Sequence, residues 1–264
     1  MKRITSKDNP QYRKLKQFAS NSAAARRERY AILDGVHLCQ SYLEHVGHPA
    51  LCVVSQTSQY HAEVSEIIAE CEKGNAQCLL LPDGLFRPLS QVGSGIDIVF
   101  LVLKPVYDTL PELVQNAVLL DRIQDPGNVG SILRSAAASG IRQVYCSVGT
   151  ASVWTPRVLR AGMGAHFLLE VFENVSLETL IETSKIPVVA TTPYARSTIY
   201  DIDLRSSVAW LLGHEGGGIS ESLMERASDR VVIPHAGLME SLNVAACAAV
   251  CFFEQMRQCL SGRK

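Results

Sequence analysis

The sequence lacks any apolar run that approaches the roughly 18 residues of a membrane-spanning helix. Its first ten residues, MKRITSKDNP, also lack the apolar core of a secretory signal. The 264 residues, of which 47% are hydrophobic and 19% charged, can bury a sizeable core in one large or two modest domains. We therefore expect a soluble protein of the cytoplasm that does not enter a membrane.

CxxC pairs are also missing, although the chain contains eight cysteines. Most of them lie inside apolar runs, where a free thiol packs as a small hydrophobic side chain. We expect these cysteines to be reduced and unbridged. His45 and His48 stand close to Glu44, but no second cluster with ligand spacing accompanies them, which favours a solvated turn. We predict no metal site.

Three common nucleotide-binding and catalytic motifs are absent. Gly127 and Gly130 follow an apolar run, but the earlier glycine of GxGxxG and an acidic residue about 20 positions further on are missing. The lysine and hydroxyl of GxxxxGK[ST] are absent, and Ser241 lacks the GxSxG surroundings of a serine nucleophile. These absences disfavour dinucleotide-dependent, P-loop and serine hydrolase activities.

The net charge of −1 hides a strong gradient along the chain. Residues 1–30 contain nine lysines and arginines against Asp8 and Glu28, a net charge of +7, which leaves −8 for the remainder. A basic arm with Tyr12 and Phe18 suits nucleic acid, because cations neutralise phosphates and aromatic rings can stack on exposed bases. A solvated basic helix would have the same composition, so this pattern leaves both interpretations open.

The first part of the chain reads as a small α/β layer structure. Asn9-Pro10 predicts a helix start, and apolar runs at 30–33, 51–54, 78–81 and 98–103 predict strands. Helical segments are expected near 36–46 and 60–73. The segment KPVYDTLPELVQN, with two prolines, interrupts the periodicity. We therefore predict a domain at 1–104, a linker at 105–115 and a second domain at 116–264.

The second domain shows a longer α/β alternation. AVLLD, VYCSV, FLLEV, VVAT, AWLLG and RVVIP read as strands, and GNVGSILRSAAASG reads as a helix. Such alternation favours a largely parallel sheet covered by helices. Ligands of open α/β sheets bind at the carboxyl ends of the strands.

Glycine and polar residues concentrate in three stretches that follow predicted strands: DRIQDPGNVGSILRSA, GHEGGGIS and IPHAGLMESLNVAA. Glycine permits a close approach of backbone to a ligand, while Asn, Glu, Ser and Arg offer directional hydrogen bonds. Any one stretch is adequately explained as a turn with a helix cap. Three of them in one domain favour a binding site.

These stretches resemble a known family. LDRIQDPGNVGSILRSAAASGI (the first motif), LLGHEGGGIS (the second motif) and VVIPHAGLMESLNVAA (the third motif) look like the three motifs of the SpoU (TrmH) branch of the SPOUT RNA methyltransferases, in order and at similar spacing. ITSKDNPQYRKLKQF and YAILDGVHL more loosely resemble the RNA-binding α/β domain that many of these enzymes carry first. The resemblance covers nearly the whole chain.

The resemblance implies a SPOUT-type parallel sheet with a C-terminal trefoil knot that binds S-adenosylmethionine. Knots are rare exceptions to chain topology, and periodicity does not distinguish this one from an ordinary doubly wound sheet. The resemblance also implies a homodimer formed through the catalytic domain. The last helix is apolar all round from Val244 to Phe253, which fits a helix covered on all sides, although burial within one subunit would give the same pattern.

Site residues also follow from the resemblance. The positions that line the reaction centre in similar enzymes match Asn128, Arg134, Glu215, Ser241 and Asn243. The positions that bind the cofactor match Gly213, Ile233 and Leu242, together with Thr191.

Arg134 stands six residues after Asn128, nearly two helical turns, so both can serve one end of the site only if Asn128 belongs to the loop that enters the helix. The family mechanism often makes this arginine the base for the hydroxyl proton. A guanidinium normally stays protonated, and a nearby phosphate strengthens that tendency. We therefore expect Arg134 to hold the target phosphate and so to position the ribose.

Ser241 and Asn243 are expected to cap the last helix and to face the substrate pocket, with Leu242 turned toward the cofactor. A purely structural cap would explain the same residue types. Departures from the family pattern are mild. His214 stands where Asn is frequent and His235 where Met is frequent. The position of His214 allows two interpretations, a general base or a structural residue of the tight glycine turn. We favour the structural residue.

The resemblance implies transfer of a methyl group from S-adenosylmethionine to a ribose 2'-hydroxyl of RNA. The chain length and the separate first domain look more like the rRNA-directed than the tRNA-directed members. The alternative is a donor-binding RNA module or ribosome-assembly factor without turnover.

Overall fold

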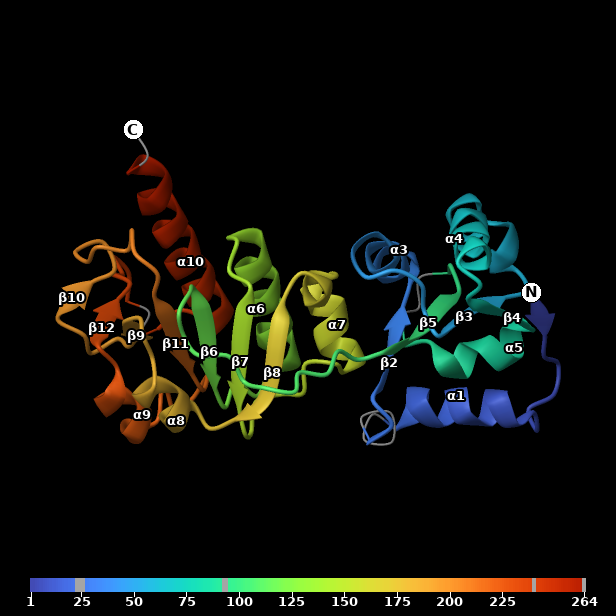
Figure 1. Ribbon diagram of the computed structural model, residues 1–264, viewed down its shortest axis with the longest axis horizontal. Coiled ribbons are helices and arrows are strands. Elements are labelled where there is room, and N and C mark those ends of the chain that lie inside the picture. The colour runs from blue at the N-terminus through green and yellow to red at the C-terminus, as the bar shows by residue number, and fades with distance from the viewer. Residues whose placement is uncertain (22–26, 92–94, 239–240, 263–264) are drawn as a thin grey trace. The chain divides into compact units, whose positions relative to one another are not determined.

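Two sheets organise the chain in the computed structural model, which describes residues 1–21, 27–91, 95–238 and 241–262 (Figure 1). The first unit consists of Met1–Val106 and Trp154–Phe167, and the second consists of Tyr107–Val153 and Leu168–Lys264. Residues 105–115 contain neither helix nor strand. The segment 154–167 packs with the first unit, which the boundaries expected from the sequence did not include.

The first unit contains a five-stranded sheet in the order β1-β4-β3-β5-β2. Pairing is parallel along β1, β4 and β3, while β5 runs antiparallel to both β3 and β2. The four strands predicted from apolar runs are therefore present. The strands are β1 (Lys2–Arg3), β2 (Tyr30–Asp34), β3 (Leu51–Ser55), β4 (Gln77–Leu81) and β5 (Ile98–Leu103). The helices are α1 (Pro10–Ser20), α3 (Val36–His45), α4 (Ala62–Lys73), α5 (Asp83–Phe86) and α7 (Pro156–Gly162), with 3-10 turns at Ser58–Tyr60, Arg87–Leu89 and Ala165–Phe167.

Helix α1 covers one face of this sheet. The side chain of Asn9 caps it, and Tyr12, Leu15 and Phe18 recur at helical spacing and are 2%, 2% and 3% exposed. The interpretation that the rings of Tyr12 and Phe18 stack on exposed bases, which the composition left open, is therefore wrong, because both rings belong to the core. Hydrophobic side chains of α3, α4 and α7, including Leu159, pack on the opposite face.

The second unit contains a seven-stranded sheet in the order β10-β12-β9-β11-β6-β7-β8, and every neighbouring pair is parallel. The predicted parallel sheet is confirmed. The strands are β6 (Ala117–Asp121), β7 (Gln143–Ser147), β8 (Glu170–Val175), β9 (Val188–Thr191), β10 (Ser197–Thr198), β11 (Ala209–Gly213) and β12 (Asp229–Val232). The helices are α6 (Pro126–Ala138), α8 (Leu177–Glu182), α9 (Glu221–Arg226) and α10 (Val244–Ser261).

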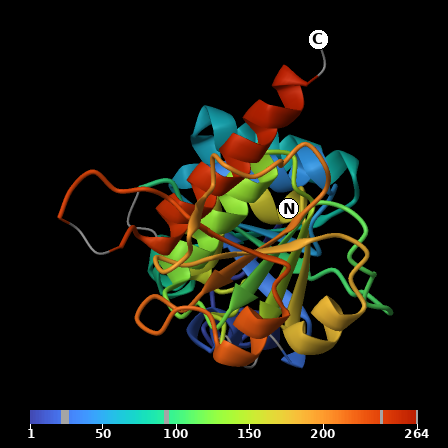
Figure 2. The same ribbon diagram turned by 90° about the vertical axis from the view of Figure 1, so that its left-hand side faces the viewer.

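Alternating strand residues face different helices of the second unit. Leu119 and Leu211 share a core with Leu180 of α8 and Leu223 of α9. On the other face the indole of Trp210 donates a hydrogen bond of 2.9 Å to Oε1 of Gln255 in α10. Helices α6 and α10 lie side by side, with α8 and α9 across the sheet from them (Figure 2).

Amide side chains fix the far part of α10. Nε2 of Gln255 donates to Oδ1 of Asn116, which directly precedes β6, at 2.9 Å. Oε1 of Gln258 accepts a hydrogen bond from the backbone N–H of Leu204 at 2.9 Å, and its Nε2 donates to the carbonyl of Ile202 at 3.2 Å. The connection between β10 and β11 is thereby attached to the last helix.

Candidate functional site

The three family-like motifs begin at the same edge of the parallel sheet. Strand β6 leads into the first motif, β11 into the second and β12 into the third, and Gly213 at the end of β11 is in register with Asp121 at the end of β6. The chain steps outward from β6 to β7 and β8, then returns to place β9 and β11 on the other side of β6. Ligands of open α/β sheets bind at such a reversal of strand order, beyond the carboxyl ends of the strands.

The carboxylate of Glu215 connects the first and second motifs. Its Oε1 accepts hydrogen bonds from the backbone N–H of Asp125 at 3.1 Å and from Nδ2 of Asn128 at 3.0 Å. Its Oε2 accepts a hydrogen bond from the backbone N–H of Gln124 at 3.2 Å. Glu215 thus binds the loop that enters α6 and the first turn of α6 together.

Hydrogen bonding decides the charge state of Glu215. Its partial burial by itself would raise the pKa of the carboxyl group, but the bonds from the Asn128 side chain and from backbone N–H groups stabilise the ionised form. The pKa of Glu215 is consequently lowered from its ordinary value. A carboxylate held in this way is a weak proton acceptor and a strong organiser of loops.

Asn243 connects the third motif to the same cluster. Its Nδ2 donates to Oδ1 of Asn128 at 2.9 Å, while its own Oδ1 accepts hydrogen bonds from the backbone N–H groups of Ala245 and Ala246. Asn243 is therefore the N-cap of α10, as expected. Ser241 is exposed and precedes the cap by two residues, so the expectation that it also caps the helix is wrong.

Arg134 does not join this cluster within one chain. Asn128 lies in the first turn of α6 instead of the preceding loop, so the condition set by the spacing is not met. Six helical residues separate the two positions by about 9 Å along the axis and about 240° around it. The side chain of Arg134 is exposed and makes no hydrogen bond or ion pair with the residues that the structure describes.

Three of the expected cofactor positions lie at neighbouring strand ends. Thr191 ends β9, Gly213 ends β11 and Ile233 directly follows β12, in the strand order β12-β9-β11. At Gly213 an added Cβ would lie 2.2 Å from the backbone nitrogen of Ile219, so the chain approaches here as only glycine permits. Leu242 is 43% exposed, next to Asn243. The third motif also includes Met239 and Glu240, which lie outside the described residues.

The contribution of Gln124 and Asp125 was not predicted from the sequence. Both donate through backbone N–H groups to Glu215, so their side-chain types carried no signal for this contact. Asp125 also caps α6 by accepting the N–H of Asn128 at 2.9 Å. Only the Asp-Pro pair at a helix start indicated that role.

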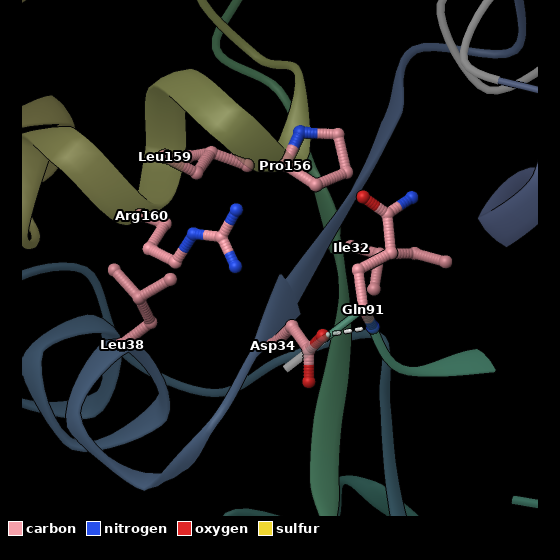
Figure 3. A pocket seen from close by; sticks show the side chains of 7 residues that line it. All are labelled: Ile32, Asp34, Leu38, Gln91, Pro156, Leu159 and Arg160. Atoms are coloured by element: carbon pink, nitrogen blue, oxygen red, sulfur yellow. Dashed lines mark hydrogen bonds between the residues drawn. The ribbon is translucent and has the colours of Figure 1, made fainter. Parts of the chain in front are cut away.

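A separate hollow lies in the first unit, lined by Ile32, Asp34, Leu38, Gln91, Pro156, Leu159 and Arg160 (Figure 3). Its carboxylate, on Asp34, already accepts hydrogen bonds from Ser90 Oγ and the backbone N–H of Gln91. It contains none of the motif residues. Within the described ranges, no group of three or more His, Cys, Asp and Glu side chains could hold a metal ion. In the same part of the chain, no helix is long and apolar enough to span a bilayer.

Comparison with known proteins identifies the family. The sequence profile described as the SpoU rRNA Methylase family matches residues 115–253. An uncharacterized tRNA/rRNA methyltransferase from Synechocystis is 30% identical over 261 residues, which cover 97% of this chain and 93% of the relative. The chain belongs to the SpoU rRNA methylase family. The resemblance on which the three motifs were assigned is therefore confirmed.

Two further proteins match nearly the whole chain. The 23S rRNA (guanosine(2553)-2'-O)-methyltransferase RlmP from Bacillus subtilis is 26% identical, with coverage of 95% of this chain and 97% of the relative. The crystal structure of the SpoU methyltransferase AviRb from Streptomyces viridochromogenes, in complex with the cofactor AdoMet, superimposes with a TM-score of 0.84. It is 24% identical and covers 97% of this chain and 100% of AviRb. At that identity the likeness shows that the two share a fold.

Proposed function

We propose that this protein transfers a methyl group from S-adenosylmethionine to a ribose 2'-hydroxyl of RNA, with ribosomal RNA as the substrate class ahead of transfer RNA. The observation that carries the proposal is the hydrogen-bonded chain Asn243–Asn128–Glu215, which joins all three family motifs at one edge of the parallel sheet. Membership of the SpoU family and the name of RlmP support the reaction. The cytoplasm is the proposed location.

The residues at the strand ends fit a binding site for S-adenosylmethionine, which supplies the electrophilic methyl group when bound. The backbone of Gly213 packs directly against that of Gly218 and Ile219, which leaves no room for a side chain, and Ile233 and Leu242 add apolar side chains nearby in the sequence motifs. Thr191, at the end of β9, lies between Gly213 of β11 and Ile233 after β12 in the strand order. These four residues would hold the cofactor. AviRb, which has the same fold, was crystallised in complex with AdoMet, and this supports the assignment.

The reaction-centre residues then divide their roles by charge and position. Glu215 and Asn128 fix the loops, because the three hydrogen bonds to the carboxylate leave it a weak base. Arg134 is exposed, and its planar, positively charged guanidinium group can bind an RNA phosphate through two parallel hydrogen bonds. Ser241 contributes an exposed hydroxyl beside Asn243. Asn128, Glu215 and Ser241 would place the ribose for transfer, while Arg134, which lies apart from them within one chain, would hold a phosphate of the same RNA.

The exposed stripe of α10 supports a homodimer formed through the second unit. Ala246, Val250 and Phe253 recur on one face of the helix, Arg257 and Leu260 continue that face, and Phe253 and Leu260 are 41% and 59% exposed. The helix is apolar all round from Val244 to Phe253, so an uncovered face in that part fits burial by a second copy. The trefoil knot belongs to the same proposal, on the likeness to SpoU family structures.

The first unit is proposed to bind the RNA substrate. Exposed cations are present at Lys2, Lys7 and Lys16, and none of the three forms an ion pair with the described residues. Phosphate contacts of this kind give affinity without sequence readout. The aromatic side chains of Tyr12 and Phe18 in this unit are buried and cannot stack on bases. The proposal that the first unit binds RNA therefore depends on its positive charge.

A methylation assay tests the function. The purified protein, with S-adenosylmethionine and unmodified rRNA, is expected to produce a ribose methylation that mass spectrometry can map, and RNA from cells without the gene should lack it. Asn128→Ala should abolish the product, while Asn9→Ala, which removes an asparagine cap in the first unit, should not. If the protein binds S-adenosylmethionine but transfers no methyl group to RNA, the alternative function is favoured, namely a donor-binding RNA module or ribosome-assembly factor without turnover. No calorimetric binding of S-adenosylmethionine or S-adenosylhomocysteine would overturn both functions.

A further inference from the structure

The turn that carries Glu215 is closed at its base by Asp121. Gly213, where the turn begins, pairs in register with Asp121, and the backbone N–H of Ser220, where it ends, donates to Oδ2 of Asp121 at 2.8 Å. Asp121 is 3% exposed, and its Oδ1 accepts a hydrogen bond from Nε of Arg122 at 3.1 Å. Both ends of the segment 213–220 are therefore attached to one residue of β6.

The tip of the same turn is closed by His214. Its backbone exchanges two hydrogen bonds with Gly218, of 3.0 and 2.8 Å. Its ring nitrogen Nδ1 accepts hydrogen bonds from the backbone N–H groups of Gly216 at 2.9 Å and Gly217 at 3.0 Å. An imidazole that accepts at Nδ1 is neutral and carries its proton on Nε2. His214 cannot act as a base through Nδ1 without releasing both glycines.

Apart from these contacts and the three hydrogen bonds of Glu215 itself, the tip of the turn has little packing. Glu215 and the three glycines that follow are exposed, so no packed core fixes their conformation. Glycine residues also lose more conformational freedom on ordering than any other residue. The orientation of the Glu215 carboxylate toward Gln124, Asp125 and Asn128 therefore depends on the hydrogen bonds at the base and the tip.

We infer that Asp121 and His214 are positioning residues for the methyl transfer proposed above, on which this inference rests. Neither reaches the substrate; both act through Glu215. Asp121 fixes where the turn leaves and rejoins the sheet edge, and His214 fixes the shape of the glycine tip. His214 does so through a single acceptor atom, which an asparagine Oδ1 at the same position could replace, because short side-chain amides accept hydrogen bonds from the next backbone N–H groups.

Substitution at His214 gives the first test. His214→Ala is expected to lower kcat by about 10-fold to 100-fold, since small misplacements at a reaction centre have effects of that size. The Kd for S-adenosylmethionine should change much less. His214→Asn should recover most of the lost kcat. An unchanged kcat in His214→Ala, or no recovery in His214→Asn, would overturn the inference for His214.

Asp121 is tested in the same way, with Asp121→Asn retaining an acceptor for the Ser220 N–H and Asp121→Ala removing it. We expect kcat to fall in the order wild type, Asp121→Asn, Asp121→Ala. Because Asp121 is buried, thermal melting must show that each variant folds, and only folded variants are compared. Equal kcat for the two folded variants would overturn the role of Asp121.

The histidine tautomer can be measured without any activity. Two-dimensional ¹⁵N–¹H NMR of the full chain at neutral pH, with His214→Asn to assign the signals, should show His214 as the Nε2–H tautomer. An Nδ1–H tautomer or an imidazolium would refute the acceptor role. A wild-type protein that shows the expected tautomer but transfers no methyl group would instead contradict the proposed function.

Discussion

The side-chain amide of Asn243 donates a hydrogen bond of 2.9 Å to that of Asn128, across 115 positions of the sequence. The same amide uses its oxygen to cap α10 through Ala245 and Ala246. One residue therefore starts the last helix and connects it to the first motif. Capping and function do not compete at Asn243, because they use different atoms.

The two roles of Asn243 can be separated by substitution. Asn243→Asp keeps an oxygen for the cap but removes the N–H donor to Asn128, so we expect unchanged or slightly higher stability with methyl transfer reduced about 100-fold. Asn243→Ala removes both, and should also lower the free energy of unfolding by about 1 kcal/mol. Urea denaturation and initial-rate assays measure the two effects. Full activity in Asn243→Asp would show that the contact with Asn128 is dispensable.

Glycine at position 213 is predicted to be required, while a neighbouring glycine is not. In Gly213→Ala the new Cβ would lie 2.2 Å from the backbone nitrogen of Ile219, and we expect a loss of about 1–3 kcal/mol in the free energy of unfolding together with weaker cofactor binding. Gly216→Ala is the matched control, since its Cβ would lie 3.6 Å from Cε1 of His214, an ordinary contact. Chemical denaturation and calorimetry compare them. Similar losses in both variants would argue against a special constraint at Gly213.

The lowered pKa of Glu215 predicts a pH-dependent contribution to stability. Because the folded-state pKa lies below that of the unfolded chain, the contribution is fully present above the ordinary value of about 4.3 and is lost as the pH falls through the lower folded-state pKa. Wild type should therefore exceed Glu215→Gln in unfolding free energy near neutral pH, and the difference should vanish in acid. Denaturant titrations on both sides of the ordinary value, from about pH 2 to about pH 7, test this. A difference that grows toward acid would have the wrong sign.

Arg134→Lys is expected to lose most of the methyl transfer while leaving the fold intact. A lysine keeps the charge but cannot bind a phosphate with two parallel N–H groups. Since Arg134 is exposed and unpaired among the described residues, its replacement should change the unfolding free energy by no more than about 0.5 kcal/mol. Steady-state kinetics with varied RNA measure the loss. Wild-type rates in Arg134→Lys would show that charge alone is sufficient.

The dimer proposal predicts that a charge on the exposed stripe of α10 separates the copies. Phe253→Asp places a carboxylate in a face that is apolar at Ala246, Val250 and Leu260, and desolvating that charge would oppose association. Light scattering should give the mass of a monomer for this variant and of a dimer for wild type. Tyr60→Asp, at an 83% exposed position of the first unit, is the control and should remain dimeric. A monomeric wild type would contradict the proposal directly.

The sequence predicted strands and helices well where the apolar pattern was strong. The runs at 30–33, 51–54 and 98–103 lie in β2, β3 and β5, and AVLLD coincides with β6. Prediction was poorer at FLLEV, since β8 begins only at Glu170 after a 3-10 turn at Ala165–Phe167. Apolar residues there serve a turn as well as a strand, and composition does not mark the boundary.

Long-range contacts were beyond what the sequence could give. Helical spacing placed Tyr12 and Phe18 on one face of α1, but did not say that this face meets the sheet. The packing of residues 154–167 with the first unit depends on contacts of Leu159 with residues far earlier in the chain. The family likeness selected Asn128, Glu215 and Asn243, yet their mutual hydrogen bonds follow from strand register, which no local pattern specifies.

The attachment of α10 at both ends has a consequence for how the protein is made on the ribosome. Asn128 and Glu215 are translated well before Asn243, and all seven strands of the second sheet precede α10 in the chain. A nascent polypeptide halted after Val232 would contain every strand but neither the amide that closes the hydrogen-bonded chain nor the glutamines that fasten the β10–β11 connection. We therefore expect the site to become able to bind its ligands only at the end of synthesis, when α10 packs against the sheet.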